Sequence, residues 1–85
     1  MYYVYVLQSQ SDKDLYIGYT DNLKRRFDEH NSKQNKSTAH RTPFRLVYYE
    51  SYQSKSDAKY REKQLKRHAQ AYIALKKRIR NSISE

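Results

Sequence analysis

Apolar and polar side chains alternate along three stretches in the first half of the chain, and this alternation predicts three β-strands. Residues 2–8 are β-branched or aromatic at nearly every position, which predicts a strand covered on both faces. Residues 15–20 predict a second strand, and the short polar segment 9–14 before it favours an antiparallel hairpin. Residues 44–50 alternate in the same way and predict a third strand.

A helix is expected between the second and third strands. It should run to about residue 31, with Thr20 or Asp21 accepting hydrogen bonds from its first free amides. Two apolar and two polar side chains share its inward face: Leu23, Arg26, Phe27 and His30. The polar residues 31–43 that follow have the length and composition of a binding loop or a mobile loop.

The last third of the chain predicts a second helix. Ser54 followed by Asp57 has the spacing of a helix cap, so this helix should begin near Lys55. Its inward stripe contains one acid among mostly apolar positions: Ala58, Glu62, Leu65, Ala69 and Tyr72, then Ile73, Leu75 or Lys76, and Ile79. We expect a bend near residue 70 and a frayed end over residues 81–85.

Charge and composition narrow the class of protein. The 85 residues carry 18 lysines and arginines against 9 acidic residues, and the net charge of +9 favours nucleic acid as a partner, with an anionic membrane surface as the alternative. The absence of cysteine excludes disulfides and thiolate zinc sites. Because no signal peptide and no apolar run of about 20 residues is present, we expect a single soluble domain, residues 1–85, in the cytoplasm and not in a membrane.

Three polar side chains stand where the helical patterns call for apolar ones, and each has two interpretations. Glu62 is either paired with one of the many basic residues or available to a hard cation such as Mg²⁺. Arg26 either lays its stem over the edge of the core or neutralises charge on a phosphate. His30 is either a helix cap or part of the same site. With Tyr5 and Tyr16, which approach each other if they face the same side of the hairpin, these residues indicate phosphate chemistry.

The tyrosine-rich strands resemble the signature of the GIY-YIG nuclease family, in its small single-domain bacterial form. Residues 16–18 (YIG) match the second half of the signature, and residues 3–5 (YVY) stand at the first half. Ten residues separate Tyr5 from Tyr16, as expected for the two signature tyrosines. The one departure is Tyr3, which replaces the first glycine at a backbone position and removes no catalytic group.

The resemblance extends to the helices. Arg26 lies eight residues beyond Gly18 and His30 four residues further, where such domains carry their catalytic arginine and histidine. Glu62 stands at the position of the family's metal-binding glutamate. The likeness covers about residues 2–80, and it is specific because all of these positions are in register.

What the resemblance implies is an α/β (α+β) fold in which a three-stranded antiparallel sheet is flanked by helices, with the site on one sheet face. The implied activity is a divalent-metal-dependent endonuclease that hydrolyses DNA phosphodiester bonds, in DNA repair or recombination. Glu62 would hold one Mg²⁺ or Mn²⁺ ion, and Tyr16 would deprotonate or orient the attacking water with help from Tyr5. Arg26 would stabilise the pentacovalent phosphate, and His30 would accept a proton from Tyr16 or hold its hydroxyl.

Substrate contacts are expected from Gly18, Lys24, Arg25 and Arg41, with Gly18 letting the backbone approach the substrate closely. The expected partner is DNA or RNA, and a homodimer or a partner protein would supply targeting. The alternative function is a non-catalytic nucleic-acid-binding module, in which strand tyrosines stack on bases and the basic helix over residues 59–80 follows the backbone. A protein-interaction factor that keeps the fold for stability is a third.

Overall fold

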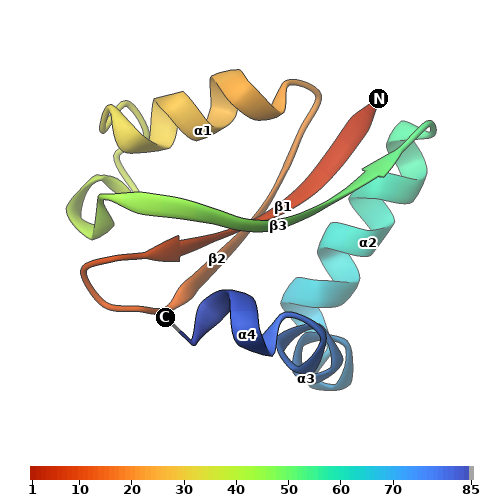
Figure 1. Ribbon diagram of the computed structural model, residues 1–85. Coiled ribbons are helices and arrows are strands. Elements are labelled where there is room, and N and C mark those ends of the chain that lie inside the picture. Colours follow the sequence, from red (N-terminus) through yellow and green to blue (C-terminus); the bar gives the residue numbers. More distant parts are fainter. Residues whose placement is uncertain (85) are drawn as a thin grey trace.

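The middle layer of the molecule is an antiparallel sheet, as seen in the computed structural model, which describes residues 1–84 (Figure 1). Its elements are β1 Tyr2–Ser9, β2 Leu15–Thr20, α1 Leu23–Asn31, the 3₁₀ turn η1 Ala39–Arg41, β3 Phe44–Tyr52, α2 Lys55–Arg67, α3 Ala69–Arg78 and α4 Arg80–Ile83. The strand order is β2-β1-β3, with α1 on one side of the sheet and the other helices on the opposite side (Figure 1). The expected fold class is confirmed.

The central strand β1 is covered on both faces, as its continuous apolar sequence predicts. Val4 and Val6 pack against the apolar side chains of α2 and α3. Tyr5 and Leu7 point to the opposite face and pack with Phe44 and the apolar side chains of α1. Burial of each large aliphatic side chain contributes about 1.5–3 kcal/mol, so the two clusters hold a helix layer on each side of a thin sheet.

Helix α1 begins one residue later than the sequence predicts. Its N-cap is Asn22, whose side chain accepts a hydrogen bond from the Arg25 amide at 3.1 Å. Thr20, one of the two expected caps, is instead engaged with the Asn22 backbone, from which it accepts a hydrogen bond at 3.0 Å. Asp21, the other, points to the Arg25 guanidinium at 3.5 Å. The correction moves the cap by a single residue and leaves the inward face of α1 unchanged.

The C-terminal helices follow the prediction up to His68, where the backbone leaves the helical conformation and α2 ends. Ser54 caps α2, as expected. The inward stripe restarts after the break, so Ala69 is exposed instead of buried, while Leu75 is buried in α3. The expected fraying is wrong for residues 81–83, which form most of α4, and residue 85 lies outside the described part of the chain. Among residues 1–84, no helix combines the length and hydropathy needed to cross a bilayer.

Glu50 joins strand β3 to helix α2. Its carboxylate accepts two hydrogen bonds from the Arg61 guanidinium, at 2.9 and 3.0 Å, and one from each of the Tyr48 and Tyr52 hydroxyls. Burial raises the pKa of this carboxyl, but the hydrogen bonds from Arg61, Tyr52 and Tyr48 outweigh burial and hold the pKa below its ordinary value. Glu50 is therefore an ionised, fully bonded anchor between the sheet and the helix layer that carries Glu62.

Gly18, the single glycine of the chain, lies under the Tyr5 ring. The two residues are direct partners in the β1–β2 register, and a Cβ atom at position 18 would overlap the Tyr5 hydroxyl and the adjacent ring carbons. The close approach that requires glycine here is thus an approach by the protein's own phenol. Gly18 itself is buried.

Replacement of Gly18 by alanine is expected to reduce the free energy of unfolding by about 1–3 kcal/mol, because the added methyl group overlaps the Tyr5 phenol. Urea denaturation measures this loss. In a Tyr5→Leu background, which lacks the overlapping ring atoms, the same replacement should cost much less. Equal losses in the two backgrounds would contradict the steric explanation.

Glu50→Gln is expected to lower the free energy of unfolding by about 1–3 kcal/mol at pH 7. Because folding lowers the Glu50 pKa below 4.5, this stabilisation is present above that value and is lost as the pH falls through the folded-state pKa. Denaturation curves at pH 7 and at about pH 3 should therefore show a deficit that shrinks in acid. Asp28→Asn, which breaks an exposed pair within α1, is the matched control and should cost at most about 0.5 kcal/mol.

Candidate active site

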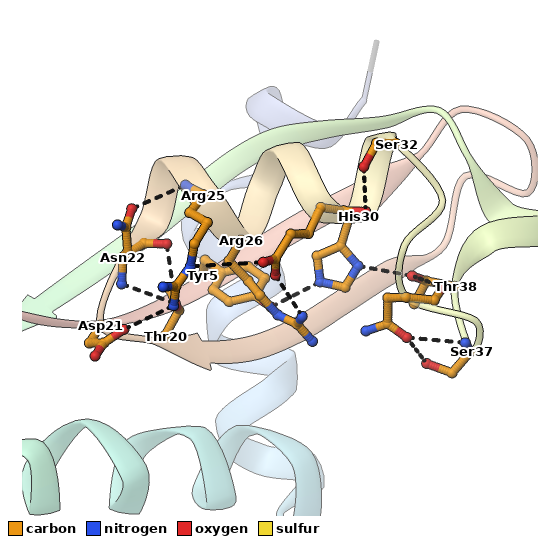
Figure 2. Close-up of polar contacts among 12 residues, drawn as sticks. Tyr5, Thr20, Asp21, Asn22, Arg25, Arg26, His30, Ser32, Ser37 and Thr38 are labelled. Atoms are coloured by element: carbon orange, nitrogen blue, oxygen red, sulfur yellow. Dashed lines mark hydrogen bonds and ion pairs between the residues drawn. The ribbon is translucent and has the colours of Figure 1, made fainter.

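The hairpin and helix α1 bring Tyr5, Tyr16, Arg26 and His30, all of them expected site residues, together on one face of the sheet. Figure 2 shows Tyr5, Arg26 and His30. The rings of Tyr5 and Tyr16 lie with their centroids 6.4 Å apart. The His30 ring stands edge-on to both, at 5.0 Å from Tyr16 and 6.0 Å from Tyr5. Arg26 lies one turn earlier on α1, with its guanidinium close enough to act on the Tyr5 hydroxyl. Residues from two strands and one helix thus form a single polar cluster.

His30 is fully buried, and both of its ring nitrogens have hydrogen-bond partners. Nε2 lies 3.0 Å from the Tyr5 hydroxyl oxygen and Nδ1 lies 2.9 Å from Thr38 Oγ1 (Figure 2). Burial lowers the pKa of His30, and the positive charge of Arg26 lowers it further, so the imidazole is neutral at pH 7. The sequence analysis expected His30 to act on Tyr16. The hydroxyl that it contacts is that of Tyr5, because the Tyr5 ring lies across Gly18 toward α1.

Tyr5 is a neutral hydrogen-bond donor in this cluster. Burial raises its pKa to about 12, and the neighbouring Arg26 guanidinium offsets only part of that rise. A buried hydroxyl without an acceptor would cost about 1–3 kcal/mol. His30 Nε2 is the acceptor that the Tyr5 hydroxyl needs. Tyr5 therefore supports its neighbours as a phenol and does not carry charge.

Arg26 is held in place and remains charged. Its Nη1 atom donates to Glu29 Oε1 at 3.1 Å, and its side chain is 31% exposed. Burial lowers its pKa, but the hydrogen bonds to Tyr5 and Glu29 outweigh burial and raise it. A guanidinium has five N–H donors in a planar fork, so donors remain for a phosphate at the exposed side.

Glu62 comes from the opposite helix layer, and Lys66 links it to the cluster beside strand β2. Its Oε2 atom accepts a hydrogen bond from Lys66 at 3.1 Å, and its side chain is 23% exposed. The Lys66 ammonium also lies 5.9 Å from the centroid of the Tyr16 ring, so it connects the carboxylate to the tyrosine. The expected placement of the whole site on one sheet face is wrong, because helix α2 packs on the other face (Figure 1). Of the two interpretations of Glu62 given by the sequence, pairing with a basic residue is therefore observed.

The donor set around Glu62 fits a hard cation that keeps most of its water. No group of three or more histidine, cysteine, aspartate or glutamate side chains gathers anywhere in residues 1–84. Mg²⁺ binds proteins through one or two carboxylates, water and substrate phosphates, and one partly exposed carboxylate meets that need. A site for a tightly ligated transition metal would require more nitrogen or sulfur donors than this part of the chain gathers.

Two hollows lie on this part of the molecule, one of them lined by Tyr16 of the cluster. One has a volume of about 270 Å³ and is lined by Leu15, Tyr16, Ile17, Leu65, Lys66 and Tyr72. The other, about 550 Å³, lies along the outer side of α1 and contains Lys24 and Arg25. Both of these basic residues are paired with acidic residues of α1 and its cap region. Arg41 is bound to Asp12 at 2.8 Å and lies over the Phe44 ring, so the expected substrate contacts of all three remain predictions.

Sequence reasoning missed three members of the site. Thr38 lies in a polar loop that carries no periodic pattern, and only the unusual length of that loop pointed to it. Glu29 and Lys66 lie one helical turn from Arg26 and Glu62, so their spacing of three and four residues was a usable signal. Each of the three contacts a residue that the sequence analysis did identify.

Comparison with known proteins agrees with this geometry. Residues 1–80 match the family model described as the GIY-YIG catalytic domain. The chain is 48% identical over 66 residues to a UPF0213 protein of Natronomonas pharaonis, covering 76% of each chain. It is 41% identical over 78 residues to a UPF0213 protein of Streptococcus pyogenes serotype M5, covering 85% of this chain and 84% of the relative.

A solved structure extends the comparison to the fold. The solution NMR structure of a UPF0213 protein from Bacillus halodurans is 36% identical and superposes with a TM-score of 0.52 over 89% of this chain and 86% of that chain. The residues that match the family model include the strands and helices that build the cluster. The chain belongs to the GIY-YIG family.

Proposed function

We propose that the protein is a divalent-metal-dependent endonuclease that hydrolyses DNA phosphodiester bonds, as in DNA repair or recombination. The observation that carries the proposal is the cluster of Tyr5, Tyr16, Arg26 and His30 beside the carboxylate of Glu62, in a chain of the GIY-YIG family. A purely structural core has no need of a charged arginine and a neutral histidine joined through one buried phenol.

In the proposed reaction a water molecule attacks phosphorus and its oxygen forms the new P–O bond. The bond to the leaving oxygen breaks, and the proton that the water loses to solvent is balanced by the proton that the leaving oxygen takes up from solvent. Tyr16 lines the hollow beside β2, so we assign it the role of orienting this water. Glu62 would hold Mg²⁺ or Mn²⁺, which supplies positive charge to the phosphate and to the leaving oxygen. Arg26 binds the nonbridging oxygens, where charge accumulates.

Tyr5 and His30 position Arg26 in this scheme. The neutral His30 accepts a hydrogen bond from the Tyr5 hydroxyl at Nε2, which leaves the lone pairs of the Tyr5 oxygen for the guanidinium. Protonation of His30 would place a second donor on that oxygen and a second positive charge beside Arg26. The proposal therefore requires neutral His30 and assigns Tyr5 no charge during the reaction.

The distribution of charge fits a nucleic acid, and we propose that this nucleic acid is DNA. Helices α2 and α3 carry most of the basic side chains of the chain's second half, on the side of the sheet that supplies Glu62. The 270 Å³ hollow combines the aromatic walls of Tyr16 and Tyr72 with the ammonium of Lys66, a lining suited to a nucleotide next to the scissile bond. RNA cleavage is the alternative outcome of an assay that offers both nucleic acids.

Glu62→Gln tests the proposal against the non-catalytic binding module. We expect cleavage of labelled branched, single-stranded or duplex DNA with Mg²⁺ or Mn²⁺ to fall at least about 100-fold, because the cation loses its carboxylate. Binding measured by fluorescence anisotropy should be retained or strengthened, since a negative charge is removed. Asp57→Asn, an exposed acid on the same helix, is the matched control and should cleave normally. Absence of cleavage by the unmodified protein, or equal cleavage by Glu62→Gln, would contradict the nuclease.

The cleavage rate is expected to fall in acid, with a midpoint below about pH 6.5. Folding lowers the His30 pKa below 6.5, so the neutral form persists to lower pH than in a free histidine and is lost only below that value. Single-turnover rates between about pH 5 and pH 8 measure this limb. His40→Gln, at an exposed histidine, should leave the profile unchanged. A midpoint above pH 6.5 would contradict the assignment to His30.

A further inference from the structure

Thr38 is a buried threonine in the irregular segment between α1 and β3. It is 1% exposed, although most of its neighbours in this loop are open to solvent. Its Oγ1 atom lies 2.9 Å from His30 Nδ1 and donates toward the Asn35 carbonyl oxygen at 3.4 Å. Figure 2 shows the Thr38 side chain directed at the imidazole, on the side away from Tyr5. The loop therefore contacts the active-site cluster through the Thr38 hydroxyl.

The surrounding donors determine which nitrogen of His30 carries the proton. The Tyr5 hydroxyl is buried, and its hydrogen-bond partner among the described residues is His30. The Tyr5 proton therefore needs an acceptor, and His30 Nε2 at 3.0 Å is placed to accept it. Nδ1 must then carry the imidazole proton and donate it to Thr38.

The Thr38 hydroxyl can accept that proton because its own hydrogen has another acceptor. Oγ1 donates toward the Asn35 carbonyl, which leaves a lone pair for His30 Nδ1. The hydrogen bonds thus run in a single direction, from Tyr5 through His30 and Thr38 to Asn35. Every buried side-chain nitrogen and oxygen in the described chain has a partner, as this arrangement requires.

We propose that Thr38 is a positioning residue that holds His30 in the tautomer with the proton on Nδ1, so that Nε2 accepts a hydrogen bond from the Tyr5 hydroxyl. The tautomer follows from the contacts alone. Its effect on catalysis rests on the proposed nuclease function. In that function, loss of the Thr38 hydroxyl lets the imidazole proton move to Nε2, which then no longer accepts a hydrogen bond from the Tyr5 hydroxyl.

Nitrogen-detected or long-range ¹H–¹⁵N NMR of the imidazole tests the tautomer directly. In the unmodified protein, His30 should show a protonated Nδ1 and an unprotonated Nε2. Thr38→Val keeps the side-chain shape but removes the hydroxyl, and it should shift the signals toward the Nε2-protonated form. Thr38→Ser restores the hydroxyl and should restore the original pattern. Thr42→Val is the matched control, because the Thr42 hydroxyl bonds to Ala39 and not to His30.

Kinetics supply the second arm of the test. With a cleavable DNA, Thr38→Val should lower kcat about 10- to 100-fold with little change in KM, since Thr38 acts through His30 and does not touch substrate. Thr38→Ser should recover most of this loss. Protonation on Nε2 in the unmodified protein, or an unchanged tautomer in Thr38→Val, would overturn the inference. If the tautomer behaves as expected but the unmodified protein cuts no nucleic acid, the inference stands and the nuclease function fails.

Discussion

The hydrogen bond between the Tyr5 hydroxyl and His30 is the contact on which the arrangement of the site depends. It is buried between the sheet and α1, where an unpaired hydroxyl or imidazole nitrogen would be costly. Three other features are needed for this contact to form. Position 18 must lack a side chain, α1 must present His30 inward, and a further partner must satisfy the second imidazole nitrogen. The hydrogen bond between the Tyr5 hydroxyl and His30 thus depends on strand β2, helix α1 and the loop after α1 together.

The other face of the sheet positions the acidic part of the site. Arg61 donates two hydrogen bonds to Glu50, and Glu62 is the next residue on α2. The ion pair therefore sets the distance of α2 from the sheet at the turn from which the Glu62 carboxylate projects. A bidentate pair of a guanidinium and a carboxylate adds geometric specificity to the apolar contacts that α2 makes with the sheet. The two layers meet beside β2, where Lys66 lies near Tyr16.

Most of the fold could be predicted from the sequence because its signals are local. The β-branched and aromatic run of β1, the Ser54 cap and the spacing of Arg26 from His30 each depend on a few neighbouring residues. The partner of His30 could not be predicted, since which tyrosine hydroxyl reaches the imidazole depends on how a ring crosses the facing strand. The role of Thr38 could not be predicted from the sequence for a similar reason. Its burial results from the path of an irregular loop, which no periodicity describes.

The overlap between position 18 and the Tyr5 ring also constrains how sequences of this family can diverge. Two residues that compete for one space cannot change independently, so a chain that keeps tyrosine at position 5 must keep glycine at position 18. A side chain at position 18 becomes acceptable only after the phenol has been lost, and with it the partner of His30. Intermediate sequences would be both strained and deprived of that partner. The tyrosine at position 5 thereby requires the glycine at position 18, even though the glycine offers no functional group of its own.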